Sequence, residues 1–137
     1  MNTSFDLALA EIRSRDFQPM KLDEPVEIDE LPTPALLLDE QALQRNIDKM
    51  AGFLGGRGKG FRPHGKTHKC PLIAHRQRAA GAVGVCVAKV SEAVAMVHAG
   101  IDDVLVTSPI TNLAKARILA DLAESARISI VVDQLQG

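Results

Sequence analysis

Apolar residues along the chain form short continuous runs that alternate with stretches of helical periodicity. The runs lie at residues 35–38, 82–87, 104–107 and 128–132, and a shorter extended segment with an internal proline lies at 61–64. Runs of this kind predict strands that are buried on both faces. Between them, apolar residues recur every three or four positions, as in helices that bury one face. The expected helices cover residues 40–54, 71–80, 91–98 and 111–124.

The residues that flank each predicted helix support its ends. Asp, Ser and Thr are side chains that cap a helix N-terminus. The expected N-caps are Asp39, Ser91 and Thr111, and Asp133 follows the last predicted strand in the same way. Glycine follows the expected last turn of the first three helices, which is typical of a helix C-terminus.

The N-terminal part differs from the rest of the chain. Apolar residues on one helical face predict a helix over residues 3–15, and residues 17–34 are rich in proline and acidic residues, as in an extended linker. We therefore expect two parts. An N-terminal helix with an extended lead-in occupies residues 1–32, and an α/β domain occupies residues 33–137.

Strands that alternate with helices indicate a parallel sheet covered by helices. Periodicity leaves two architectures open, an open doubly wound sheet and a (β/α)8 barrel. The chain holds about five βα units, whereas a closed barrel needs eight units and about 250 residues. Length therefore slightly favours the open sheet. No G-x-G-x-x-G pattern follows the first strand, and the glycine-rich bend at 52–60 joins a helix to a strand. That order is wrong for a phosphate cradle at a helix N-terminus.

Charge and composition exclude several classes of protein. The formal net charge is −1, whereas nucleic-acid-binding proteins carry a basic excess. No apolar run approaches the roughly 18 residues of a membrane span, and the N-terminus lacks the apolar core of a signal peptide. We therefore expect a cytoplasmic protein without nucleic acid or membrane as a partner. In that compartment Cys70 and Cys86 are expected to be free thiols.

The segment FRPHGKTHK, at residues 61–69, gathers one arginine, two histidines and two lysines at the carboxyl end of a predicted strand. Ligands bind at such ends in parallel α/β proteins. A lysine there suits Schiff-base chemistry, because in general nearby positive charge and partial burial favour the nucleophilic free amine of a lysine. Arg62 and His64 precede Lys66 by four and two residues, so strand alternation would place all three on one side. The alternative, a solvated basic loop, stays open on spacing alone.

Other polar residues are weaker candidates for chemistry. A zinc site is not predicted, because the cysteines and histidines near Lys66 fit no common spacing and the lysines among them would repel a cation. Thr107 and Ser108 end a strand on the expected ligand face and are candidate ligand contacts. Glu92, Asp102 and Asp103 are expected to be surface charges.

Three segments resemble, in their order, the N-terminal part of the D-threonine aldolase and D-3-hydroxyaspartate aldolase family. They are TPALLLDEQALQRNI, RPHGKTHK and GAVGVCVAKVSEAVAMVHAGIDDVLVT, and together they cover about residues 33–133. The family is related to eukaryotic-type D-serine dehydratases and, more distantly, to the alanine racemase N-terminal domain. The resemblance implies a partial (β/α)8 barrel of the pyridoxal-phosphate fold type III class, and so favours the barrel over the open sheet.

The resemblance also implies a pyridoxal-phosphate-dependent lyase that cleaves the Cα–Cβ bond of β-hydroxy D-amino acids. It makes Lys66 the Schiff-base lysine, Arg62 and His64 cofactor contacts, and His68 a further candidate contact. The divalent-metal site and the C-terminal β-domain of such enzymes are expected outside this chain. Ala88 stands where relatives often have a glutamine that is a candidate cofactor contact, and alanine cannot make its hydrogen bond.

Two alternatives accompany this interpretation. In the first, the chain is a truncated, inactive fragment or cofactor-binding remnant. In the second, the enzyme is a D-serine dehydratase-like ammonia-lyase. A partial barrel would expose strand edges and apolar interior, so self-association or a homodimer is expected.

Overall fold

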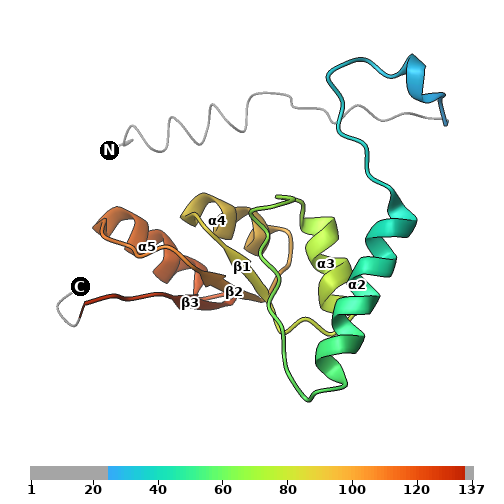
Figure 1. Ribbon diagram of the computed structural model, residues 1–137. Helices are drawn as coiled ribbons and strands as arrows, with labels where there is room; N and C mark the ends of the chain where they lie inside the picture. The colour runs from blue at the N-terminus through green and yellow to red at the C-terminus, as the bar shows by residue number, and fades with distance from the viewer. Residues whose placement is uncertain (1–24, 135–137) are drawn as a thin grey trace. The chain divides into compact units, whose positions relative to one another are not determined.

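The computed structural model describes residues 25–134 and divides the chain into two units, residues 1–37 and 38–137 (Figure 1). The described part of the first unit contains the short 3-10 helix η1 (Ile28–Glu30). Glu27 N donates to Glu30 Oε2 over 3.3 Å and caps this turn. The helix predicted over residues 3–15 lies outside the described residues.

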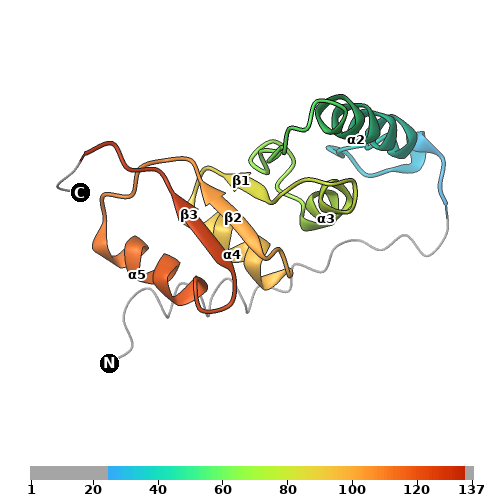
Figure 2. The same cartoon turned by 90° about the horizontal axis from the view of Figure 1, so that it is seen from below.

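The second unit is built around a parallel sheet in the order β1–β2–β3. The strands are β1 (Val85–Val87), β2 (Asp103–Val106) and β3 (Arg127–Ile130). Helices α4 (Val90–His98) and α5 (Leu113–Leu122) connect them, and Figures 1 and 2 show both helices on the same face of the sheet. The prediction of strands that alternate with helices in a parallel α/β fold is confirmed.

Two further helices precede the sheet, α2 (Glu40–Gly55) and α3 (Pro71–Ala79). The predicted cap of the first is confirmed, because Asp39 Oδ1 accepts a hydrogen bond from Ala42 N over 2.8 Å. No helix among the described residues has the length and apolar composition that crossing a bilayer requires.

Two of the predicted N-caps are wrong by one or two residues. The N-cap of α4 is Lys89 rather than Ser91, because the Glu92 carboxylate reaches back and accepts from the backbone N–H of Lys89. The N-cap of α5 is Asn112 rather than Thr111, because its side chain is the one that accepts from the first turn. In both cases a stronger acceptor next to the predicted cap decides where the helix begins.

The hydrophobic core lies between the sheet and its two covering helices. Alternate strand residues face the helices and are at most 1% exposed: Val85, Val87, Val104 and Val106. The residues between them, Cys86 and Leu105, face the other side and are partly exposed. One face of the sheet is therefore buried by helices, while the other is only half-buried within the described residues.

The strand predicted at residues 35–38 is wrong. Leu36 is 103% exposed, Leu37 and Leu38 are more than half exposed, and this segment forms no strand pairing with any described residue. An apolar run becomes a strand only where a neighbouring edge offers free backbone groups and a surface covers its side chains. The described part of the chain offers this segment neither. The segment at 61–64 pairs only through an isolated bridge, so residues 25–134 contain three strands where five were expected.

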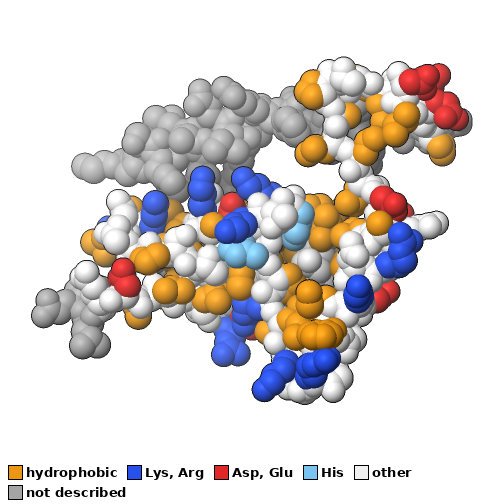
Figure 3. All heavy atoms as spheres, in the orientation of Figure 1, with side chains coloured by type: hydrophobic (Ala, Val, Ile, Leu, Met, Phe, Trp, Pro, Cys, Tyr) orange, Lys and Arg blue, Asp and Glu red, His pale blue; other side chains and the backbone are white. Residues whose placement is uncertain are grey.

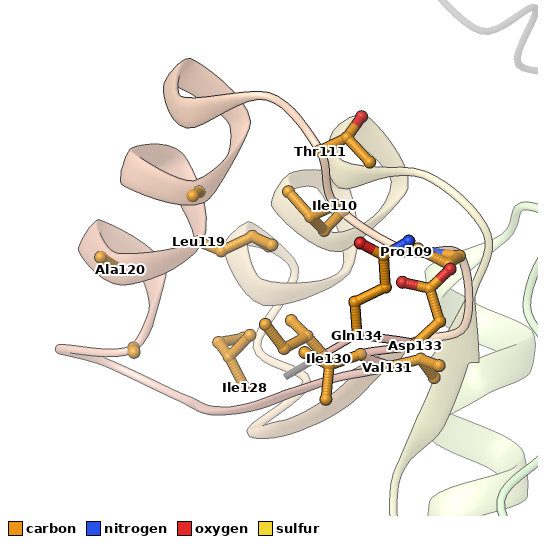
Figure 4. A pocket seen from close by; sticks show the side chains of 13 residues that line it. Pro109, Ile110, Thr111, Leu119, Ala120, Ile128, Ile130, Val131, Asp133 and Gln134 are labelled. Carbon is orange, nitrogen blue, oxygen red and sulfur yellow. The ribbon is translucent and has the colours of Figure 1, made fainter. Parts of the chain in front are cut away.

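Strand β3 forms the outer edge of the sheet, and an apolar groove runs beside it. The groove has a volume of about 610 Å³ and lies between α5 and the chain from 128 to 134. Figure 4 shows Ile110 and Leu119 pointing into it opposite Ile128 and Ile130. The described residues leave this edge without a strand partner.

We predict that the chain self-associates through this edge, because an unpaired edge and exposed apolar side chains favour pairing with another copy. Ile130→Lys places a charge in the groove and should shift the sedimentation profile toward the monomer. Leu72→Lys, at an exposed position of α3, is the matched control and should leave the profile unchanged. A wild-type chain that sediments as a compact monomer would contradict the prediction.

Candidate active site

The chain from Phe61 to Pro63 runs beside β1 and ends in the turn that carries Lys66. Cys86 N donates to Pro63 O over 2.7 Å, and Gly65 N donates to Cys86 O over 2.7 Å. A parallel bridge between His64 and Cys86 lies at the same point. The turn therefore begins beside the carboxyl-terminal half of β1, as the sequence predicts for a ligand-binding edge.

Lys66 lies on an exposed, tightly closed turn. Lys69 N donates to Gly65 O over 2.7 Å, which closes the turn from Gly65 to Lys69. Lys69 has a φ of 51°, in the left-handed region that non-glycine residues rarely adopt. The partial burial expected for Lys66 is wrong, because the residue is exposed. Figure 3 shows histidine side chains at the surface beside lysine and arginine side chains.

His64 lies next to Lys66 and is held in one tautomer. Its Nδ1 accepts a hydrogen bond from Lys66 N over 3.2 Å, so a neutral ring carries its proton on Nε2. Nε2 lies 3.1 Å from Thr107 Oγ1, which in turn donates to Val87 O over 3.0 Å. This chain of bonds links the Lys66 turn to the carboxyl ends of β1 and β2.

His68 makes the same local bond at the other end of the turn. Its Nδ1 accepts from Cys70 N over 3.0 Å, and Cys70 is the N-cap of α3. The pKa of His68 is lowered by burial. The pKa of His64 is lowered by burial first and by the charge of Lys66 second, against the opposing charge of Glu92. Both rings are therefore neutral at neutral pH.

We predict that the free energy of unfolding falls as the pH drops below about 6.5. The folded state holds both histidines with lowered pKa values, so the unfolded chain binds more protons in this range and acid favours it. Urea unfolding at pH values on either side of this point measures the effect. His68→Asn should reduce the pH dependence, with His98→Asn as an exposed control. Equal pH dependence in the His68 variant and the wild type would contradict the prediction.

Arg62 does not lie with Lys66. Its Nη1 donates to Asp103 Oδ1 over 2.6 Å and its Nη2 to Asp103 Oδ2 over 3.2 Å, at the first residue of β2. His64 instead reaches Thr107, just beyond the other end of β2. The structure thus brings His64 together with Lys66, whereas Arg62 points toward the amino end of the strands.

The prediction that Asp103 is a surface charge is wrong. The residue is 8% exposed and forms a bidentate pair with Arg62, its neighbour across the fold. A buried carboxylate is retained only where such a partner compensates its charge. Asp102 next to it is exposed and pairs with Arg78 over 2.8 Å, as a surface charge does.

A polar hollow lies between the Lys66 turn and the start of α4. It has a volume of about 320 Å³ and is lined by Lys69 and by residues of the first turns of α4, including Lys89, Ser91 and Glu92. The Glu92 carboxylate accepts from the backbone N–H of Ala88 over 2.9 Å. Glu92, expected to be a plain surface charge, is therefore half-buried and fixes the start of α4.

The two cysteines are free thiols in the structure. Cys86 donates to Arg62 O over 3.5 Å, and burial raises the pKa of its thiol against the opposing charge of Arg62. A protonated, half-buried thiol is a packing group rather than a nucleophile. Among the described residues, no three His, Cys, Asp or Glu side chains lie close enough together to hold a metal ion.

The sequence profile described as alanine racemase, N-terminal domain, matches residues 38–137. The chain belongs to this family. A D-threonine aldolase of Arthrobacter sp is 44% identical over 101 residues, which are 74% of this chain and 27% of that protein. A 3-hydroxy-D-aspartate aldolase of Paracoccus denitrificans is 44% identical over 110 residues, 79% of this chain and 28% of that protein.

Solved structures of the family have the same fold. The crystal structure of D-threonine aldolase from Filomicrobium marinum superposes with a TM-score of 0.77 at 48% identity, over 80% of this chain and 30% of that one. D-threo-3-hydroxyaspartate dehydratase from Delftia sp. HT23 gives a TM-score of 0.71 at 32% identity, over 78% and 28%. The chain thus spans less than a third of the relatives that it matches.

Proposed function

We propose that this chain is the N-terminal part of a pyridoxal-phosphate-dependent lyase, with Lys66 as the lysine that binds the cofactor. The proposed reaction cleaves the Cα–Cβ bond of a β-hydroxy D-amino acid and yields an aldehyde and a smaller amino acid. The observation that carries the proposal is the exposed Lys66 on a turn fixed beside His64 at the carboxyl edge of a parallel sheet. The aldolase names of the similar proteins support the same class of substrate.

The residues around Lys66 fit the aldehyde end of pyridoxal phosphate. An aldehyde reacts with an accessible amine, and Lys66 is exposed and takes part in none of the ion pairs among the described residues. Gly65 is buried, and a side chain there would press on Met96 Cε and Val85 Cγ2 at 3.2 Å. The turn can therefore sit close against the strand that positions it.

The chain's own residues would bind and orient the reacting groups. Bound pyridoxal phosphate supplies the electron sink that a bond cleavage at Cα requires. Lys66 would hold the cofactor covalently, and His64, neutral with its proton on Nε2, would stand beside it. The cofactor contact of Arg62 stays a prediction, since its guanidinium is engaged with Asp103. The divalent metal of the implied family finds no ligand set among the described residues, so it enters no step here.

Borohydride reduction in the presence of pyridoxal phosphate tests the proposal. We expect a single adduct that peptide mass spectrometry maps to Lys66, because that amine is accessible and its backbone is fixed. Lys66→Ala should abolish the adduct, whereas Lys115→Ala, on the exposed side of α5, should not change it. Label scattered over several lysines in the wild-type chain would refute the proposed role of Lys66.

A dehydratase is the second candidate function. A D-threo-3-hydroxyaspartate dehydratase of Delftia sp. strain HT23 is 43% identical over 75 residues, so this part of the chain is similar to proteins named for both reactions. The products separate the two: an aldolase releases an aldehyde and glycine from D-threonine, whereas a dehydratase releases ammonia and a keto acid. Release of neither product by a chain that still labels at Lys66 would favour the inactive, cofactor-binding fragment.

A further inference from the structure

The two histidines of the Lys66 turn make the same bond to the backbone. His64 Nδ1 accepts from the N–H of Lys66, and His68 Nδ1 accepts from the N–H of Cys70, each two residues further along the chain. Asparagine and aspartate make this bond when they form Asx-turns, in which a side-chain acceptor mimics part of a backbone turn. Lys66 therefore lies between two side-chain-stabilised turns, and the second joins its loop to α3.

The outer nitrogen of His68 is buried without a partner. Because Nδ1 accepts from Cys70, the neutral ring carries its proton on Nε2, which must find an acceptor when it is buried. Gln77 Oε1, on α3, is a buried acceptor that also lacks a partner within hydrogen-bond distance. Burial lowers the pKa of His68, whereas the Cys70 backbone and, to a smaller extent, the Gln77 side chain raise it, which is consistent with Gln77 lying beside the ring. The two unpartnered atoms are thus a complementary donor and acceptor.

We infer that His68 is a positioning residue for Lys66. It holds the turn through its bond to Cys70, and its Nε2 bonds to Gln77 Oε1 once these two buried, unpartnered atoms approach. This inference rests on the proposed function of Lys66 as the cofactor-binding lysine. The turn needs such support, because Lys69 is held in the left-handed region at a φ of 51°. Without the link to α3, the turn would keep its backbone bonds and the His64 contact but lose the anchor at its far end, and the Lys66 amine would sample other positions.

Four variants separate the two halves of this role. His68→Asn keeps an acceptor for the N–H of Cys70, but its side chain is too short to reach Gln77. His68→Gln is long enough to reach Gln77 but loses the bond to Cys70 N–H. Gln77→Leu removes the acceptor from α3, and His68→Ala removes both contacts. With pyridoxal phosphate and borohydride, we expect His68→Ala to lower the rate of labelling at Lys66 about tenfold and to spread label to neighbouring lysines. His68→Asn and His68→Gln should each restore part of the rate.

A second measurement needs no cofactor. Heteronuclear NMR of the imidazole nitrogens should show His68 with its proton on Nε2, and Gln77→Leu should shift that signal while the chain stays folded. A ring with its proton on Nδ1 would overturn the inference by itself. So would wild-type labelling at Lys66 that His68→Ala leaves unchanged. A wild-type chain without selective labelling at Lys66 would instead overturn the proposed function, and this inference with it.

Discussion

Gly84→Ala is expected to destabilise the chain by about 3 kcal/mol, which is enough to unfold a marginally stable domain. Gly84 is buried directly before β1, and a Cβ atom there would lie 2.5 Å from the backbone oxygen of Asp103 and would overlap Arg62 Nη1. The arginine can move away only by giving up its pair with Asp103. The backbone oxygen belongs to a strand of the sheet and cannot move without disturbing the ladder.

Gly52→Ala is the matched control for this variant. Gly52 lies inside α2, and a Cβ atom there would meet nothing within 4 Å. Alanine should therefore stabilise the helix by about 0.5–1 kcal/mol, because it removes backbone freedom from the unfolded chain. Urea unfolding followed by circular dichroism measures both variants. Equal stability of Gly84→Ala and the wild type would mean that the contact beside β1 is looser than described.

Asp103→Asn should cost about 2–3 kcal/mol of unfolding free energy. The side chains of Arg62 and Asp103 are 21% and 12% exposed, and the substitution leaves the guanidinium without a compensating charge. Asp102→Asn is the matched control on the adjacent residue. Its carboxylate is 70% exposed in its pair with Arg78, so its loss should cost less than about 1 kcal/mol.

Salt distinguishes the two ion pairs further. The effect of Asp102→Asn should shrink at high ionic strength, because mobile ions screen exposed charges, whereas the effect of Asp103→Asn should persist. The double variant Arg62→Met with Asp103→Leu should recover much of the lost stability, because it leaves no buried charge unpaired. If Asp103→Asn and Asp102→Asn lower the free energy of unfolding equally, burial does not set the strength of the Arg62–Asp103 pair.

Periodicity predicted helices α2 to α5 and strands β1 to β3. The signal is clearest where burial follows it, as in α4, which buries Val90, Ala93 and Met96 on one face. It failed at residues 35–38, where the run is apolar but the described residues offer no edge and no covering surface. Propensity cannot report whether a partner strand is present. The starts of α4 and α5 were missed by two residues and one residue, because Glu92 and Asn112 supply stronger acceptors than the predicted capping residues.

The candidate site was predicted in part. The segment that carries Lys66 stood out through its local density of cationic side chains, and the structure places it at the expected edge of the sheet. The burial of Asp103 could not be predicted, because its partner Arg62 lies 41 residues away in the chain. The histidine bonds depend on the backbone of the turn. The sequence carries only one signal for these bonds: each histidine precedes by two residues the backbone N–H that donates to it, which belongs to Lys66 for His64 and to Cys70 for His68.

The exposed segment at residues 32–38 is also where we expect limited proteolysis to divide the chain. It contains no helix or strand, and extended, exposed backbone is where proteases cut most readily. A protease that cleaves after leucine should therefore act at Leu36 to Leu38 before it acts on the buried strands. Because Lys66 and both turn histidines lie beyond that point, brief digestion should release a fragment that retains the whole candidate site and lacks the first unit.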